Sequence, residues 1–193
     1  MKEIFNNKTS KLTFMGIMLA ITALFVVATA IPNFAVSVAV IMFLPTIITG
    51  IILGPVHGAI MGLFAGVFTM LRALFMPMSP FDYFFINPLV SVLPRIFIGV
   101  IASFVFKLFG RKLRVNAIFS SSIAGGAGIL TNTFLVILML YLVNGQVMVE
   151  AFGMGFIGAL ITLFLSNGII ELLSAIIVVP IIYGAFKSYA KSK

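Results

Sequence analysis

The sequence predicts an all-α bundle of six membrane-spanning helices, with the N- and C-termini in the cytoplasm. Of its 193 residues, 62% are hydrophobic and only 8% are charged, whereas soluble domains carry about 25% charged residues. The Lys and Arg residues gather in three clusters, one at each end and one in the middle of the chain. The positive-inside rule places all three clusters in the cytoplasm, so an even number of spans separates them. An unusually apolar soluble helical domain is the alternative that this composition disfavours.

The net charge of +8 does not by itself indicate nucleic-acid binding, because the basic clusters flank apolar runs, as expected of a membrane protein. The chain lacks cysteine, which excludes disulfides and thiolate metal sites. We expect no cleaved signal peptide, since the first apolar run is as long as a true span and has no A-x-A-like site. The clusters comprise Lys2, Lys8 and Lys11; Lys107, Arg111, Lys112 and Arg114; and Lys187, Lys191 and Lys193.

The first span is expected at residues 12–31, an uncharged run long enough to cross a core of ~30 Å at ~1.5 Å per residue. Gly16, Ala20 and Ala23 give it a face of small side chains. Small residues let a second helix approach closely in lipid. This face therefore serves either packing within the bundle or docking of a partner membrane protein.

The second span is expected at residues 36–53, after an outside turn at Pro32-Asn33. Pro45 is expected to bend it, and Gly54-Pro55 to end it on the cytoplasmic side. His57 lies beside this turn with no Cys, Asp or Glu nearby. We interpret it as a turn residue, and we expect neither a metal site nor a cofactor.

The third span is expected at residues 56–74, with glycines at positions 58, 62 and 66 on one helical face. This spacing indicates tight helix packing, and no Lys-Ser/Thr follows to make a phosphate loop. The outside loop at residues 75–85 carries the single aspartate, Asp82, among aromatic residues that include Tyr83. The aromatic residues form either a membrane-interface belt or a lid over a pocket.

The fourth span, at residues 86–106, starts at Asn87-Pro88, where Asn caps free N–H groups and Pro suits the first turn. Pro94 cannot donate a hydrogen bond within the helix and is expected to bend it. Arg95 follows this bend among apolar residues. A cation at that depth faces a cavity, a partner or a ligand. We take Arg95 to mark a pocket for a small anion.

The last two spans are expected at residues 117–143 and 158–186, joined by an outside turn at residues 144–146. Asn132 lies near the middle of the former, where an amide must find polar partners. In the latter, Asn167 and Glu171 are four residues apart and share a face. We prefer one final span over two, because two would place the last basic cluster outside. All six spans form one domain, residues 1–193.

These residues indicate recognition rather than catalysis. The sequence has no plausible serine–histidine–acid set, no paired carboxylates within a span and no HExxH motif. A few fixed polar groups within an apolar wall are typical of a binding pocket, and Arg holds a carboxylate through two parallel hydrogen bonds. The candidate substrate-binding residues are Arg95, Asn87, Ser91, Asn132, Asn167, Tyr83, Asn33 and Glu171.

A second interpretation pairs Arg95 with Glu171, as a structural ion pair or as part of the coupling path of a proton-driven carrier. Arg95 is expected about eight residues, ~12 Å, inside the outer end of its helix. Glu171 is expected nearer the cytoplasmic half. This difference in depth disfavours direct pairing.

The chain resembles the substrate-binding (S) components of energy-coupling factor (ECF) vitamin transporters. The resemblance rests on six short-looped helices, on Gly54-Pro55-x-x-Gly58-Ala59 and, above all, on the run NPLVSVLPRIFIG at residues 87–99, which is most similar to the pantothenate-type members. It implies a prokaryotic plasma-membrane subunit that holds a vitamin near its outer surface. It also implies separate partners, a transmembrane coupling protein and two cytoplasmic ATPases, with Gly16 and Ala20 facing the coupling protein.

Two other function classes stay open on sequence grounds. One is a self-sufficient secondary transporter for a small organic anion, against which the lack of a detectable inverted repeat counts. The other is a structural subunit of a membrane complex, which would bind no small ligand.

Overall fold

The computed structural model describes residues 7–31, 41–153 and 155–189, which are almost entirely helical and contain no strand. Within them, five helices are long and apolar enough to cross a membrane, and Leu44–Leu53 is a shorter apolar helix. The predicted all-α membrane bundle is confirmed. Asn33 and the first part of the expected second span, at residues 36–40, lie outside the described residues.

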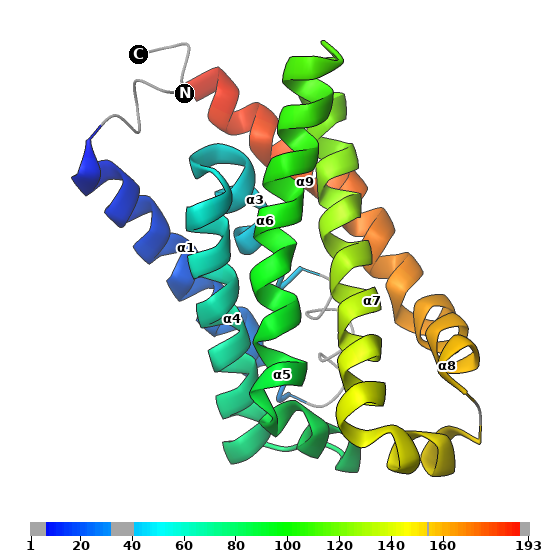
Figure 1. The fold of residues 1–193 in the computed structure, drawn as a ribbon. Coiled ribbons are helices and arrows are strands. Elements are labelled where there is room, and N and C mark those ends of the chain that lie inside the picture. The colour runs from blue at the N-terminus through cyan, green and yellow to red at the C-terminus, as the bar shows by residue number, and fades with distance from the viewer. Residues whose placement is uncertain (1–6, 32–40, 154, 190–193) are drawn as a thin grey trace.

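Several expected spans consist of more than one helical segment (Figure 1). The fourth is a short helix followed by a longer one, and the last contains a π-helical segment between two α-helices. The elements are α1 (Lys8–Ala28), α3 (Leu44–Leu53), α4 (Pro55–Phe75), the 3-10 helix η1 (Pro80–Ile86), α5 (Pro88–Ser91), α6 (Leu93–Lys107), the π-helix η2 (Leu108–Lys112), α7 (Ala117–Phe152), α8 (Phe156–Leu163), the π-helix η3 (Phe164–Gly168) and α9 (Ile169–Tyr189).

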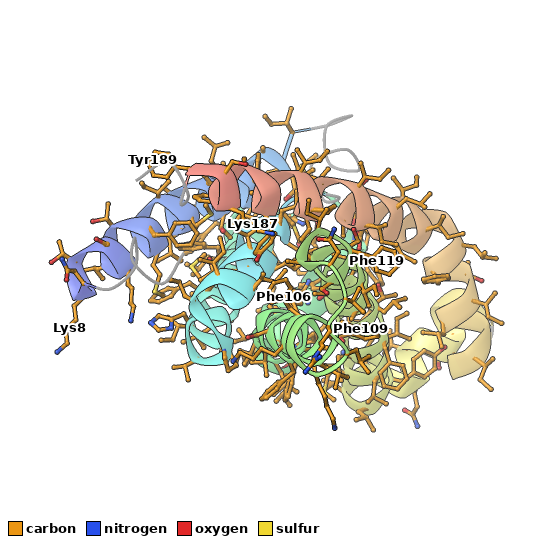
Figure 2. All side chains as sticks on the ribbon, turned by 90° about the horizontal axis from the view of Figure 1, so that it is seen from above. Lys8, Phe106, Phe109, Phe119, Lys187 and Tyr189 are labelled. Atoms are coloured by element: carbon orange, nitrogen blue, oxygen red, sulfur yellow. The ribbon has the colours of Figure 1, made fainter. Side chains whose placement is uncertain are left out.

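The basic ends of the helices gather at one end of the bundle. Figure 2 looks onto this end, where Lys8 of α1 and Lys187 of α9 lie. The α3–α4 turn is there too, because the Nζ of Lys107 lies 3.9 Å from the position that a Cβ would take on Gly54. Gly54 has φ 103°, a conformation that favours glycine. This end is the cytoplasmic one by the positive-inside rule, and η1 lies at the opposite, outer end (Figure 1).

The centre of the bundle is formed by α6, which packs between α4 and α7. The glycine face of α4 lies directly on the backbone of the α5–α6 segment. A Cβ on Gly62 would overlap the carbonyl oxygen of Arg95, and a Cβ on Gly66 would lie 2.5 Å from the Cα of Val92. The predicted close-packing role of these glycines is confirmed, and it fixes the position of Arg95 relative to α4.

One local expectation was wrong. Pro45 does not bend a helix but lies in the first turn of α3, where its missing N–H has no helical partner to lose. At the turn expected at residues 144–146, Asn144 leaves the helical region (φ −131°, ψ 31°) and divides α7 into two helices that meet at a kink, the second of which continues to Phe152. Gly153, with φ 62°, provides the actual stop.

Candidate binding site

The site begins at the break between α5 and α6. The side chain of Asn87 accepts a hydrogen bond from the N–H of Leu89 at 2.9 Å and so starts α5. The helix is interrupted at Val92 and resumes at Leu93, with Pro94 in its first turn, and the bend expected at Pro94 stays a prediction. Pro94 has no N–H to offer the carbonyl of Val90. That carbonyl instead accepts a hydrogen bond of 2.8 Å from Nη1 of Arg95.

The guanidinium of Arg95 is held between two aromatic rings. Its Cζ lies 5.8 Å from the ring centroid of Phe43 and 5.2 Å from that of Phe85. A cation near a ring face is attracted by the ring quadrupole, the more so where water is excluded, and Arg95 is only 4% exposed. Within the described part of the chain, its Nε has no hydrogen-bond partner. The side chain is thus positioned but retains unused donor capacity.

Arg95 and Asn132 line the same cavity of about 200 Å³. Asn132 is 6% exposed, and its Oδ1 lacks a hydrogen-bond partner among the residues that the structure describes. A buried amide oxygen without a partner costs about 1–3 kcal/mol, a cost that a ligand donor in the cavity would remove. The lining residues are Met42, Phe43, Phe81, Phe85, Arg95, Asn132, Thr133, Val136, Ile137, Leu140, Gly168 and Glu171.

Glu171 also lines this cavity, although the sequence placed it at a different depth from Arg95. Its helix, α9, crosses the bundle obliquely (Figure 1) and packs against α7 and α3. The charges of Glu171 and Arg95 attract each other. Nevertheless, the ion pairs found in the described ranges do not include these two residues, so space remains between acid and base.

Three other predicted residues, Asn87, Ser91 and Tyr83, lie elsewhere, while Asn33 and the side chain of Asn167 fall outside what the structure describes. Asn87 is used as a helix cap, and Ser91 is fully buried with its Oγ donating to the carbonyl of Asn87 at 3.1 Å. Tyr83 is 62% exposed on η1. Asn167 lies in η3, next to the cavity-lining Gly168. Of the eight candidates, the structure therefore brings together Arg95, Asn132 and Glu171.

Sequence reasoning missed the aromatic walls. Phe43 precedes α3, while Phe81 and Phe85 belong to η1, and all three line the cavity. The lining by η1 supports the lid interpretation of the outside loop over the belt interpretation. No signal singled out these side chains, because the chain has 21 phenylalanines.

A second missed feature is an ion pair at the outer end. Nη2 of Arg72 lies 2.7 Å from Oδ1 of Asp82. Burial raises the pKa of the Asp82 carboxyl, but the Arg72 guanidinium and the N–H groups of Met78 and Ser79 outweigh this and hold the pKa below its ordinary value of 3.8. A signal was available: Asp82 is the single aspartate, and Arg72 is one of two basic residues outside the clusters.

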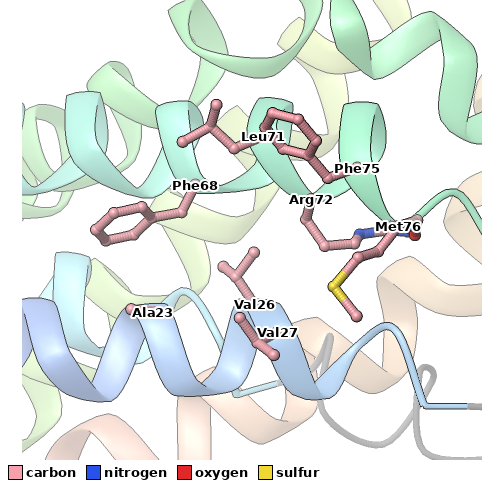
Figure 3. Close-up of a pocket in the computed structure, with 8 residues that line it drawn as sticks. All are labelled: Ala23, Val26, Val27, Phe68, Leu71, Arg72, Phe75 and Met76. Carbon is pink, nitrogen blue, oxygen red and sulfur yellow. Dashed lines mark hydrogen bonds between the residues drawn. The ribbon is translucent and has the colours of Figure 1, made fainter.

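A separate groove of about 240 Å³ lies between α1 and α4 (Figure 3). Its walls are apolar side chains such as Val26, Phe68 and Phe75, apart from Arg72, whose guanidinium pairs with Asp82. It lacks the converging polar groups that recognise a soluble ligand. Ala23 lines this groove, while Gly16 and Ala20 lie further along α1 and are exposed.

A protein-family model described as "ECF transporter, substrate-specific component" matches residues 10–183. A search of curated proteins found no significant match.

Proposed function

The chain belongs to the substrate-specific components of ECF transporters, and on this premise we propose that its cavity binds a small vitamin carboxylate, most specifically pantothenate. Family membership makes it a multi-pass protein of the prokaryotic plasma membrane and a transport subunit rather than an enzyme. Components of this family bind a small molecule and work with a coupling protein and ATPases. The identity of the vitamin is our proposal.

The observation that carries the proposal is the state of Arg95. A guanidinium that is 4% exposed normally has an anionic partner, yet in the described residues it is held only by a carbonyl and two rings. A ligand carboxylate in the cavity would supply the missing charge. The hydroxyl and amide groups of pantothenate would match the free oxygen of Asn132 and the carboxylate of Glu171.

The size of the cavity supports a compact ligand. Its volume of about 200 Å³ lies below the ~300–1,000 Å³ of pockets that take drug-sized molecules. The aromatic residues around Arg95 would exclude water, which strengthens a guanidinium–carboxylate interaction. We therefore favour pantothenate over larger vitamins, in agreement with the pantothenate-type run at residues 87–99.

Binding of radiolabelled pantothenate to the purified protein tests the proposal. We expect saturable binding, and Arg95→Ala should weaken it by at least an order of magnitude, about 1.4 kcal/mol. Lys112→Ala, at an exposed cytoplasmic residue, is the matched control and should bind like the wild type. Unchanged affinity of the Arg95→Ala variant would remove Arg95 from the site.

A second comparison isolates the carboxylate. Pantothenol carries a hydroxymethyl group in place of the carboxylate of pantothenate. The wild type should prefer pantothenate, and the Arg95→Ala variant should lose this preference. A thermal-shift screen of other vitamins shows whether a different ligand occupies the cavity, because a ligand that binds the folded state raises Tm.

A further inference from the structure

We propose that Arg72 and Asp82 are positioning residues for ligand binding: their ion pair anchors η1 to the outer end of α4, so that Phe81 and Phe85 stand against Arg95. This inference rests on the proposed function, because it assigns a role in capture to groups outside the cavity. Neither Arg72 nor Asp82 lines the cavity around Arg95, so they would act through η1.

The first step is the anchor itself. Asp82 is buried, and both of its carboxylate oxygens are used. Oδ1 accepts from Nη2 of Arg72 at 2.7 Å, and Oδ2 accepts from the N–H groups of Met78 and Ser79 at 2.7 and 3.1 Å. One carboxylate therefore both shapes the start of η1 and ties it to α4. The side chains of the pair are only 14% and 9% exposed, so solvent weakens it less than a surface pair.

The second step leads from the anchor to the cavity. Phe81 precedes Asp82 and packs edge-to-face against Phe85, with ring centroids 5.6 Å apart. The Phe85 ring in turn lies 5.2 Å from the Cζ of Arg95. Both phenylalanines line the cavity and pack against the buried Val90 and Leu140 of α5 and α7. The orientation of η1 thus sets one aromatic wall of the site.

The third step concerns the alternatives open to η1. It is seven residues long, is 3-10 in geometry and follows the exposed residues 76–79, and such short elements are held by contacts rather than by their own helicity. Loss of the anchor leaves aromatic packing to orient η1. If the binding-competent orientation then falls to about a tenth of the population, the apparent Kd rises about tenfold.

Mobility of η1 can be measured without any ligand. The chain has no cysteine, so Tyr83→Cys at an exposed position of η1 provides a unique attachment point for a spin label. In the otherwise wild-type protein we expect an immobilised spectrum. Adding Arg72→Gln, which keeps much of the aliphatic stem, should produce a mobile component, and Arg72→Lys should produce a smaller one.

Pantothenate binding provides the second measurement. Arg72→Gln and Asp82→Asn should each raise Kd about tenfold, mainly through slower association, because fewer molecules hold η1 in the binding-competent orientation. The double variant should be no weaker than Asp82→Asn alone, because both changes remove the same anchor. Glu150→Gln removes an exposed carboxylate at the outer part of α7 and should match the wild type. Arg72→Lys, which keeps the charge, should recover part of the affinity.

The outcomes separate the two proposals. If the wild type binds no carboxylate vitamin, the proposed function fails, while the spin-label comparison still decides whether the pair anchors η1. If the wild type binds pantothenate and the Arg72 and Asp82 variants bind equally well, the positioning role is overturned. A lower Tm with unchanged Kd and unchanged label mobility also overturns it, since a purely stabilising pair would give that result.

Discussion

Arg95 owes its place to the residue before it. Because Pro94 has no N–H, the carbonyl of Val90 has no helical donor. The guanidinium of Arg95 donates a hydrogen bond to that carbonyl at 2.8 Å. The same contact turns the side chain back toward η1 and Phe85. A single proline thus creates both the break and the hydrogen bond that aims the cation into the cavity.

Asn132 offers a test of whether a buried polar group is kept for binding. Asn132→Leu retains the branched shape of the side chain and removes an amide whose oxygen is unpartnered in the described structure. Relief of that burial cost should leave the ligand-free protein as stable as the wild type or more so. Pantothenate affinity should fall about tenfold, or 1.4 kcal/mol, as measured by calorimetry alongside Tm.

Thr131→Val is the matched control for this change. Thr131 is the neighbour of Asn132 in α7, but its Oγ1 donates to the carbonyl of Ala127 and it does not line the cavity. It should leave pantothenate affinity unchanged. A large loss of stability in Asn132→Leu would instead indicate that the amide supports the fold.

The lowered pKa of Asp82 predicts that the contribution of this residue to folding stability depends on pH. Its folded-state pKa lies below the ordinary 3.8, so its ionised form stabilises the fold fully above that value and progressively less as pH falls through the lower folded-state pKa. The difference in Tm between the wild type and Asp82→Asn should therefore be constant from about pH 7 to 5 and shrink toward about pH 3. A difference that stays constant throughout would contradict the role of the charge.

The sequence identified Arg95, Asn132 and Glu171 because each is a polar residue within a long apolar run, where its burial cost makes it conspicuous. The walls of the cavity offered no such contrast, since a phenylalanine that lines a cavity, such as Phe85, looks the same in sequence as one that faces lipid. The sequence also does not show that the side chains of Asn87 and Ser91 form hydrogen bonds with the backbone of α5 and its N-cap.

At the scale of elements, the contact between α4 and the α5–α6 segment decides where the site lies. Gly58 and Gly62 let the two backbones touch, and no side chain separates them. Their spacing made this seam predictable. The Asn-Gly pair at residues 144–145 indicated a turn, and the helix does break at Asn144, but the sequence did not indicate the second helical segment that follows as far as Phe152.

Gly62→Ala tests this seam. The added Cβ would overlap the carbonyl oxygen of Arg95, and backbone atoms cannot move aside as a flexible side chain can. We expect a loss of about 1–3 kcal/mol in stability together with weaker pantothenate binding. Gly184→Ala, in α9, meets nothing within 4 Å and should preserve both, so unfolding of the two variants can be compared directly.

At the scale of the whole molecule, the cavity and the face of α1 expected to meet a partner are separate. The cavity lies between η1, α6, α7 and the α8–α9 segment, whereas α1 packs against α4 and α3 and takes no part in the lining. Along α1, Gly16 and Ala20 are exposed, and a Cβ on Gly16 meets nothing within 4 Å. A small exposed face beside large apolar side chains such as Leu12 and Leu24 suits close approach of another helix.

We therefore predict that substitutions on this face separate capture from transport. Gly16→Leu should leave pantothenate binding and Tm of the isolated protein unchanged, because the new side chain has space within this subunit. In proteoliposomes that also contain a coupling protein and its ATPases, it should strongly reduce ATP-dependent uptake by holding the partner helix away.

Ile17→Leu, at an adjacent exposed residue, is the conservative control. Wild-type uptake rates in the Gly16→Leu variant would show that the coupling protein docks elsewhere. In a separate experiment, accumulation of pantothenate by proteoliposomes that contain this chain alone, driven by a proton gradient, would contradict its dependence on partners.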